Sequence, residues 1–141
     1  MGTGMGGMQT FAQDLNKAFV GGYGKIPPMF IPMIIPNMAA GNVAIALQAK
    51  AHVSCVTTAC AAATHAIGDA FRMIRDGYAD IMIAGGTEAG VSEYTLAGFN
   101  ALTALSTSND PKSASRPFDK NRDGFVLGEG SGSLVLEDLD H

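Results

Sequence analysis

Apolar residues recur at helical spacing in several stretches of the chain. The first carries Phe11, Leu15 and Phe19 on one side and is followed by Gly21-Gly22, which is typical of a helix end. A later stretch ends before Gly77, another common stop signal. Two further stretches are rich in small apolar residues or are mixed in character. We therefore expect helices over residues 9–20, 38–48, 61–76 and 92–105.

Three other stretches are continuously apolar or β-branched, as buried strands are: residues 52–58, 79–84 and 132–137. The first two flank the expected helix 61–76, which predicts parallel strands joined by a right-handed crossover. The inward stripe of that helix would consist of Ala63, Ile67, Ala70 and Ile74. This β-α-β unit predicts an α/β fold.

The segments between these elements are rich in turn-forming residues. Four prolines within residues 27–36 predict extended or turn geometry up to Asn37, and residues 106–123 are polar and turn-rich. The glycine-rich opening lacks the Lys-Ser/Thr pair of a phosphate loop, so we interpret it as a structural turn. No repeat or linker divides the sequence, and we expect residues 1–141 to belong to one domain.

Charge and cysteine content indicate which partners the chain is not suited to bind and in which cellular compartment it is expected. The net charge of −4 and the pI near 5.1 leave no broad basic surface for nucleic acid or an anionic membrane. The apolar run 26–36 is short and broken by prolines, which argues against a membrane span. Cys55 and Cys60 lack a second pair, so neither a disulfide framework nor a zinc cluster is predicted. A reducing compartment, the cytoplasm, fits best.

Cys60 lies where the expected strand 52–58 turns into the expected helix 61–76. Unpaired amides in the first turn of a helix favour negative charge, so a cysteine at this point can form a thiolate and attack an acyl thioester. The same amides can hold the oxyanion of the tetrahedral intermediate. Free cysteine also packs commonly as a small buried apolar residue, so spacing alone leaves both roles open.

Longer sequence runs surround Cys60. They are VTTACAAATHAIG at residues 56–68, GYADIMIAGGTE at 77–88, AGF at 97–99, ALST at 104–107 and SRPFDKNRDGFVLGEG at 115–130, with IP at 31–32 and PNMAAG at 36–41. Together they resemble the β-ketoacyl-[acyl-carrier-protein] synthases over practically the whole chain. Within that family they are most similar to the elongating type II enzymes, the 3-oxoacyl synthase II of bacteria and its mitochondrial counterpart.

The resemblance implies a thiolase-like α/β fold, of which this chain would form mostly the N-terminal half, with a mixed sheet and buried helices, truncated at both ends. It implies acyl transfer to Cys60 and decarboxylative Claisen condensation with malonyl-loaded carrier protein in fatty acid biosynthesis. The implied partners are the acyl carrier protein and a second identical subunit, without a metal or other cofactor. The cytoplasm is expected, with the mitochondrial matrix as the alternative.

Roles for further residues follow from the same resemblance. Met5, Phe30 and Phe99 would bind the acyl substrate, and Lys25 would dock the carrier protein. Without the family, core packing explains these side chains equally well. The family's two catalytic histidines and its lysine lie beyond the position of His141, so we expect the isolated chain to be inactive in condensation. The chain departs from the usual residues at the acyl-pocket position Met5, at two positions that are commonly basic, Gly24 and Thr103, and at Ala51, where glycine is frequent.

The three histidines and Cys55 are interpreted as structural or local. His65 follows Cys60 by five residues, which on a helix is about 500° of rotation and places the two on different faces. His52 and His141 offer no convincing proton acceptor, and Cys55 is expected to point into packing.

Residues 119–130 imitate a calcium-binding loop. The acid required at its twelfth position is replaced by Gly130, and Glu129 falls one residue short, so calcium binding is not expected. The resemblance implies instead a charged structural network of Arg116, Asp119, Arg122, Asp123 and Glu129.

Alternative functions within and beyond this family remain. A polyketide-type ketosynthase or a thiolase with a coenzyme A donor would share much of the pattern. A non-catalytic partner subunit of the chain-length-factor type would not be expected to retain a nucleophile such as Cys60.

Overall fold

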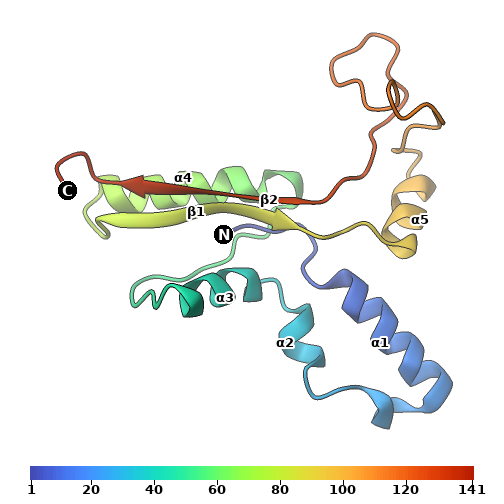
Figure 1. Cartoon of the computed structure of the whole chain (residues 1–141), viewed down its shortest axis with the longest axis horizontal. Coiled ribbons are helices and arrows are strands. Elements are labelled where there is room, and N and C mark those ends of the chain that lie inside the picture. The colour runs from blue at the N-terminus through green and yellow to red at the C-terminus, as the bar shows by residue number, and fades with distance from the viewer. The chain divides into compact units, whose positions relative to one another are not determined.

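The structure, a computed structural model, describes all 141 residues in two compact units. Unit 1 comprises residues 1–89 and 130–141, and unit 2 comprises residues 90–129. Figure 1 labels the main helices and strands of both. No helix combines the length and apolar character that crossing a bilayer requires.

Unit 1 begins with helices near the predicted positions. Helix α1 (Met8–Gly21) ends at Gly22, whose φ of +87° is accessible mainly to glycine. Helix α3 (Met38–Ala46) ends two residues before the predicted boundary. Between them lie the 3₁₀ turn η1 (Tyr23–Lys25) and the short helix α2 (Phe30–Ile34). The sequence prediction missed α2, because the prolines of this segment were taken to exclude a helix. Pro32 is compatible with the helix because it stands in the first turn, where a backbone N–H has no intrahelical acceptor.

The sheet of unit 1 consists of β1 (Ile81–Glu88) and β2 (Gly130–Glu137), which pair antiparallel from Ile81↔Glu137 to Glu88↔Gly130. The prediction that residues 52–58 form a β-strand was wrong. Only Val56 of this segment pairs with another residue, in an isolated bridge to Gly2. Gly2 also forms a parallel bridge with Gly86. The opening segment therefore lies between the two segments that were predicted to be adjacent.

Helix α4 (Ala62–Arg75) packs against β1 and follows the 3₁₀ turn η2 (Ala59–Ala61) (Figure 1). Its buried residues are Ala62, Ala66, Ala70 and Ile74, an i, i+4 series of mostly small side chains. The predicted stripe was therefore correct at Ala70 and Ile74 and wrong at Ala63 and Ile67, which are half-buried. The small residues let the helix backbone approach the glycine-rich part of β1.

Unit 2 contains helix α5 (Glu93–Ala101) and a long loop. Ser92 caps the helix, because its hydroxyl accepts a hydrogen bond from the Thr95 amide at 3.3 Å. A parallel bridge between Leu105 and Phe125 closes the base of the loop. The prediction of helix followed by turn-rich chain is confirmed here.

Candidate functional site

The turn that carries Cys60 is held by the opening segment of the chain. The Val56 amide donates to the Met1 carbonyl at 3.0 Å, and the Thr3 amide donates to the Val56 carbonyl at 3.1 Å. The chain then reverses in η2, where Ala59 has a φ of +50°, a conformation that a residue with a β-carbon adopts only at a cost. This bend leaves Cys60 exposed to solvent directly before α4.

The helix starts on either side of Cys60 have no side-chain cap. Neither Thr58, which precedes η2, nor Ala61, which precedes α4, caps the following element with its side chain. No hydrogen bond of the chain is donated by the Cys60 amide. Amides at such a helix start attract negative charge, so the turn can present N–H groups to an oxyanion formed next to the thiol. The role of Cys60 as a nucleophile stays a prediction.

Close backbone packing fixes the position of this turn. A β-carbon added to Gly86 would lie 2.5 Å from the Ala63 β-carbon, and one added to Gly2 would overlap the Ala62 carbonyl. Residue 63 lies only three positions after Cys60. The start of α4 therefore packs directly against Gly2 and Gly86, and a side chain at either position would displace the helix.

Glu88, at the end of β1, organises the loop next to the Cys60 turn. Its Oε2 accepts hydrogen bonds from the Gly4 amide at 2.5 Å and the Met5 amide at 3.2 Å, and its Oε1 accepts one from the Thr3 hydroxyl at 3.1 Å. Thr3 is buried, with 5% of its surface exposed. Sequence reasoning missed this role of Glu88, for which the only signal was a carboxylate directly after an apolar, glycine-rich strand.

The four predicted binding residues lie in different parts of the chain. Met5 is half-buried in the loop held by Glu88, and Phe30 begins α2, where its ring stacks on Phe11 with centroids 6.0 Å apart. Lys25 is exposed at the end of η1. Phe99 belongs to unit 2, where it meets Phe125 edge-to-face at 5.2 Å. Their roles in binding stay predictions.

His65 and Cys55 each have a local partner. His65 Nδ1 and Thr58 Oγ1 are 2.8 Å apart in a hydrogen bond that spans the Cys60 turn. The Cys55 thiol donates to the Pro36 carbonyl at 3.3 Å and is half-buried. Both arrangements agree with the structural roles expected from the sequence.

A cavity of about 570 Å³ in unit 1 lies apart from this turn. It is lined by α3, residues 49–56, α4 and β1, and Cys60, Met5 and Phe30 do not contribute to its wall. Its lining is mostly apolar, with Lys50, His52, Ser54 and Asp69 among the lining residues.

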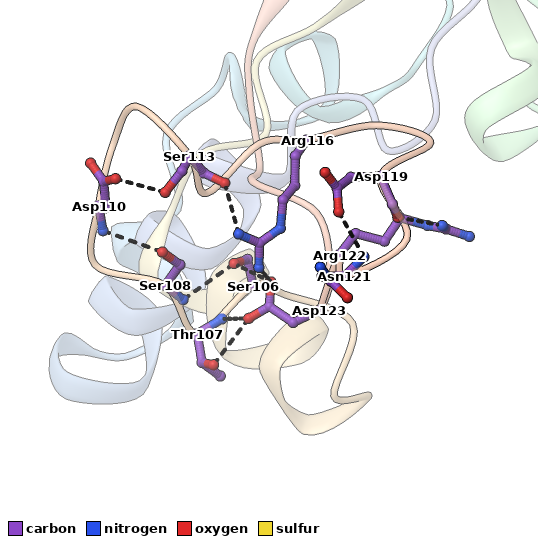
Figure 2. Close-up of polar contacts among 10 residues, drawn as sticks. All are labelled: Ser106, Thr107, Ser108, Asp110, Ser113, Arg116, Asp119, Asn121, Arg122 and Asp123. Carbon is purple, nitrogen blue, oxygen red and sulfur yellow. Dashed lines mark hydrogen bonds and ion pairs between the residues drawn. The ribbon is translucent and has the colours of Figure 1, made fainter.

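The predicted charged network of unit 2 is smaller than expected. Asp123 is its centre: its carboxylate accepts hydrogen bonds from the Ser106 hydroxyl at 2.7 Å and the Thr107 amide at 3.0 Å, and it pairs with Arg116 at 3.3 Å (Figure 2). The hydrogen bond from Ser106 first, and then those from Thr107, lower the pKa of Asp123 to about 2.

The other members of that predicted network bind backbone groups instead. The Asp119 carboxylate accepts the Asn121 amide at 2.6 Å, and the Arg122 guanidinium donates to the Asp119 carbonyl at 2.8 Å. Glu129 accepts the Val91 amide at 2.8 Å. For Asp119 and Arg122 short sequence separations explain the difference, because a side chain in a tight loop reaches its own backbone before it reaches another charge. The bond of Glu129 to Val91 spans 38 positions and is not explained in this way.

Comparison with known proteins places these features in a family. The family model described as "Beta-ketoacyl synthase, N-terminal domain" matches residues 1–141. Among curated proteins, the chain is 52% identical to a 3-oxoacyl-[acyl-carrier-protein] synthase 2 of Synechocystis over 99% of its length, which is 34% of that protein. It is 48% identical to the protein of that name from Staphylococcus aureus, again covering 99% of the chain and 35% of the relative. The chain thus spans about a third of these relatives.

Solved ketosynthases share the fold. A type II polyketide ketosynthase in complex with its acyl-carrier protein superimposes with a TM-score of 0.94 at 33% identity, covering 99% of this chain and 36% of that one. A β-ketoacyl synthase from Burkholderia phymatum gives 0.85 at 34% identity, covering 99% and 34%. These similarities confirm the predicted thiolase-like α/β fold and the predicted resemblance. The chain belongs to the β-ketoacyl synthase family, within its N-terminal domain.

Proposed function

We propose that the protein containing this chain is a 3-oxoacyl-[acyl-carrier-protein] synthase of fatty acid biosynthesis, and that Cys60 is its acyl-accepting nucleophile. The observation that supports this most strongly is the exposed thiol of Cys60 at a strained turn before α4, beside an amide without a partner. The two curated relatives described above carry the name of this activity at about half identity.

The proposed chemistry at Cys60 is acyl transfer. The thiolate attacks the carbonyl carbon of an acyl thioester, the backbone N–H groups at the turn stabilise the tetrahedral oxyanion, and the carrier thiol leaves as the acyl group stays on Cys60. Malonyl-carrier then loses carbon dioxide, and its enolate carbon attacks the acyl-cysteine, releasing the Cys60 thiolate and a 3-oxoacyl-carrier. The family's histidines and lysine for that second step lie outside this chain, so unit 1 supplies the acyl acceptor.

Substrate and partner residues complete the proposal. Met5 and Phe30 would contact the acyl chain, because the loop of Met5 contacts both the Cys60 turn and the end of α2. The proposed acyl-binding role of Phe99 rests on the family resemblance alone, and exposed Lys25 would bind the acidic carrier protein. The solved complex of a related ketosynthase with its acyl-carrier protein supports that partner. We also propose a homodimer and a cytoplasmic location; the curated relatives described above are bacterial and give no support to the mitochondrial alternative.

A polyketide-type ketosynthase is the second candidate, favoured by the TM-score of 0.94 to a polyketide enzyme. The identities of 52% and 48% to fatty-acid enzymes, against 33% to that ketosynthase, favour the first. Incubation with saturated acyl-carrier and malonyl-carrier distinguishes them. A 3-oxoacyl-[acyl-carrier-protein] synthase of fatty acid biosynthesis makes one 3-oxoacyl product from these substrates. A polyketide ketosynthase extends the unreduced chain repeatedly.

Condensation by the full-length protein and two cysteine variants tests the proposal. We expect C60A to abolish formation of 3-oxoacyl-carrier and C55A, the matched control, to retain most of it, since the Cys55 thiol is bonded to Pro36. A C60A protein that still condenses at the wild-type rate would contradict the assignment.

A further inference from the structure

We propose that Glu88 is a positioning residue that sets which acyl chain lengths the site accepts, by fixing the loop that carries Met5 beside Cys60. This inference rests on the proposed function, because it concerns the same acyl site. Glu88 itself touches neither the thiol nor, on this view, the substrate. It acts through residues 3–5, which it binds from the end of β1.

Three consecutive residues donate to the single Glu88 carboxylate. Thr3 donates through its hydroxyl, and Gly4 and Met5 donate through their amides. The Gly4 and Met5 amides have no other acceptor in the chain. Hydrogen bonds to an ionised acceptor are stronger than neutral ones, so the path of this loop depends on the carboxylate. The Thr3 hydroxyl extends the arrangement by accepting the Gly6 amide at 3.3 Å.

The loop held by Glu88 lies against both the nucleophile turn and α2. A β-carbon on Gly4 would be 3.6 Å from Ala59 Cα, an ordinary contact distance, so Gly4 lies next to the turn with about the space of one β-carbon between them. On its other side, the Gly7 amide donates to the Ile34 carbonyl at 3.2 Å. Met5 therefore belongs to the short segment between these two contacts, and the acceptor of its own amide is Glu88.

Loss of the carboxylate would leave two part-buried amides unpaired and give the loop several alternative paths. The Met5 side chain would then no longer form a fixed wall of the acyl site. A fixed wall discriminates between acyl chains that differ in length, whereas a mobile wall admits them more equally. The expected signature is therefore a changed ratio of rates between substrates and not a uniform loss.

Three variants of the full-length protein test this inference. E88A removes every acceptor. E88Q retains one oxygen for the two amides, and its NH₂ group can donate to the Thr3 hydroxyl oxygen, so it should restore most of the geometry. E137A is the matched control, since Glu137 lies at the opposite end of the same strand pair. The only hydrogen-bond partner of its carboxylate is the His141 side chain.

Two readouts are required: hydrogen exchange at residues 3–8, and kcat/KM for a short and a long acyl-carrier. For E88A we expect exchange of the Gly4 and Met5 amides to rise at least about 10-fold, the factor for losing one hydrogen bond to a charged group. We expect the ratio of kcat/KM between the two substrates to change by about the same factor. E88Q should shift either readout by less than half as much on a logarithmic scale, and E137A should leave both unchanged.

Unchanged exchange in E88A would overturn the anchoring role, and an equal loss with both substrates would overturn the role in chain-length selection. A wild-type protein that acylates no cysteine would instead overturn the proposed function. The exchange measurement would then still decide whether Glu88 holds the loop, so the two failures are distinguishable.

Discussion

The contact between Gly86 of β1 and Ala63 of α4 gives a quantitative test of how the Cys60 turn is held. A methyl group at position 86 would lie 2.5 Å from the Ala63 β-carbon and 3.1 Å from its Cα. Carbon atoms in contact are about 3.5–4.0 Å apart, so α4 must move away from β1 by roughly 1 Å. Overpacking of this kind costs about 1–3 kcal/mol, and we expect the upper half of that range because the obstacle is a helix and not a flexible side-chain end.

A double-mutant cycle isolates that contact. We expect G86A to lower the free energy of unfolding of the full-length protein by about 2–3 kcal/mol, measured by urea unfolding monitored with circular dichroism. We also expect it to slow alkylation of Cys60 by iodoacetamide. A63G removes the obstructing β-carbon but costs roughly 1 kcal/mol in a helix. G24A, where a β-carbon meets nothing within 4 Å, is the control and should stay within about 0.5 kcal/mol of wild type.

The decisive quantity is the coupling energy. The G86A/A63G protein should be more stable than the sum of the single effects predicts, by more than about 1 kcal/mol, because the second change makes room for the first. Strict additivity, or a G86A protein as stable as wild type, would show that close packing at Gly86 does not position α4 and the turn before it.

Two further predictions concern unit 2. Replacing the Ser92 cap of α5 by alanine should destabilise that helix by about 0.5–2 kcal/mol, measured as faster hydrogen exchange at residues 94–97; unchanged exchange would contradict the capping role. Because the pKa of Asp123 is lowered from its ordinary value of 3.8 to about 2, its stabilisation of the loop is present above pH 4 and lost as the pH falls towards 2. Exchange of the Thr107 amide, corrected for its intrinsic rate, should rise over that range in wild type and be high already at pH 5 in D123N; a pH-independent wild-type profile would refute this.

Local sequence signals were sufficient to predict the helices whose ends are marked by residues within or next to them. Helices α1 and α4 are amphipathic and end next to Gly22 and Gly77, both with positive φ, so periodicity and stop signals located them. The position of Cys60 between an extended segment and a helix is a local pattern that made it a candidate nucleophile. Pattern alone left a packing role open, and the assignment rests on the family resemblance. The residue's exposure and the strain at Ala59 came only from the structure.

Features that depend on distant partners could not be predicted from pattern alone. Residues 52–58 have strand-like composition, but a ladder needs a paired backbone, and in this chain only the opening segment supplies one. The bonds of Glu88 join residues more than 80 positions apart. Only tertiary structure shows that this carboxylate binds the loop of Met5 and that Gly4 of this loop lies next to Ala59.

The central claim is that Cys60 accepts the acyl group. The most direct measurement is to incubate the full-length protein with acyl-carrier protein, or with a cerulenin-type electrophile, and to locate the adduct by peptide mass spectrometry. We predict a stoichiometric adduct on the Cys60 thiol and none on Cys55, whose thiol is half-buried and bonded to Pro36. An adduct on Cys55 with Cys60 unmodified would contradict the account.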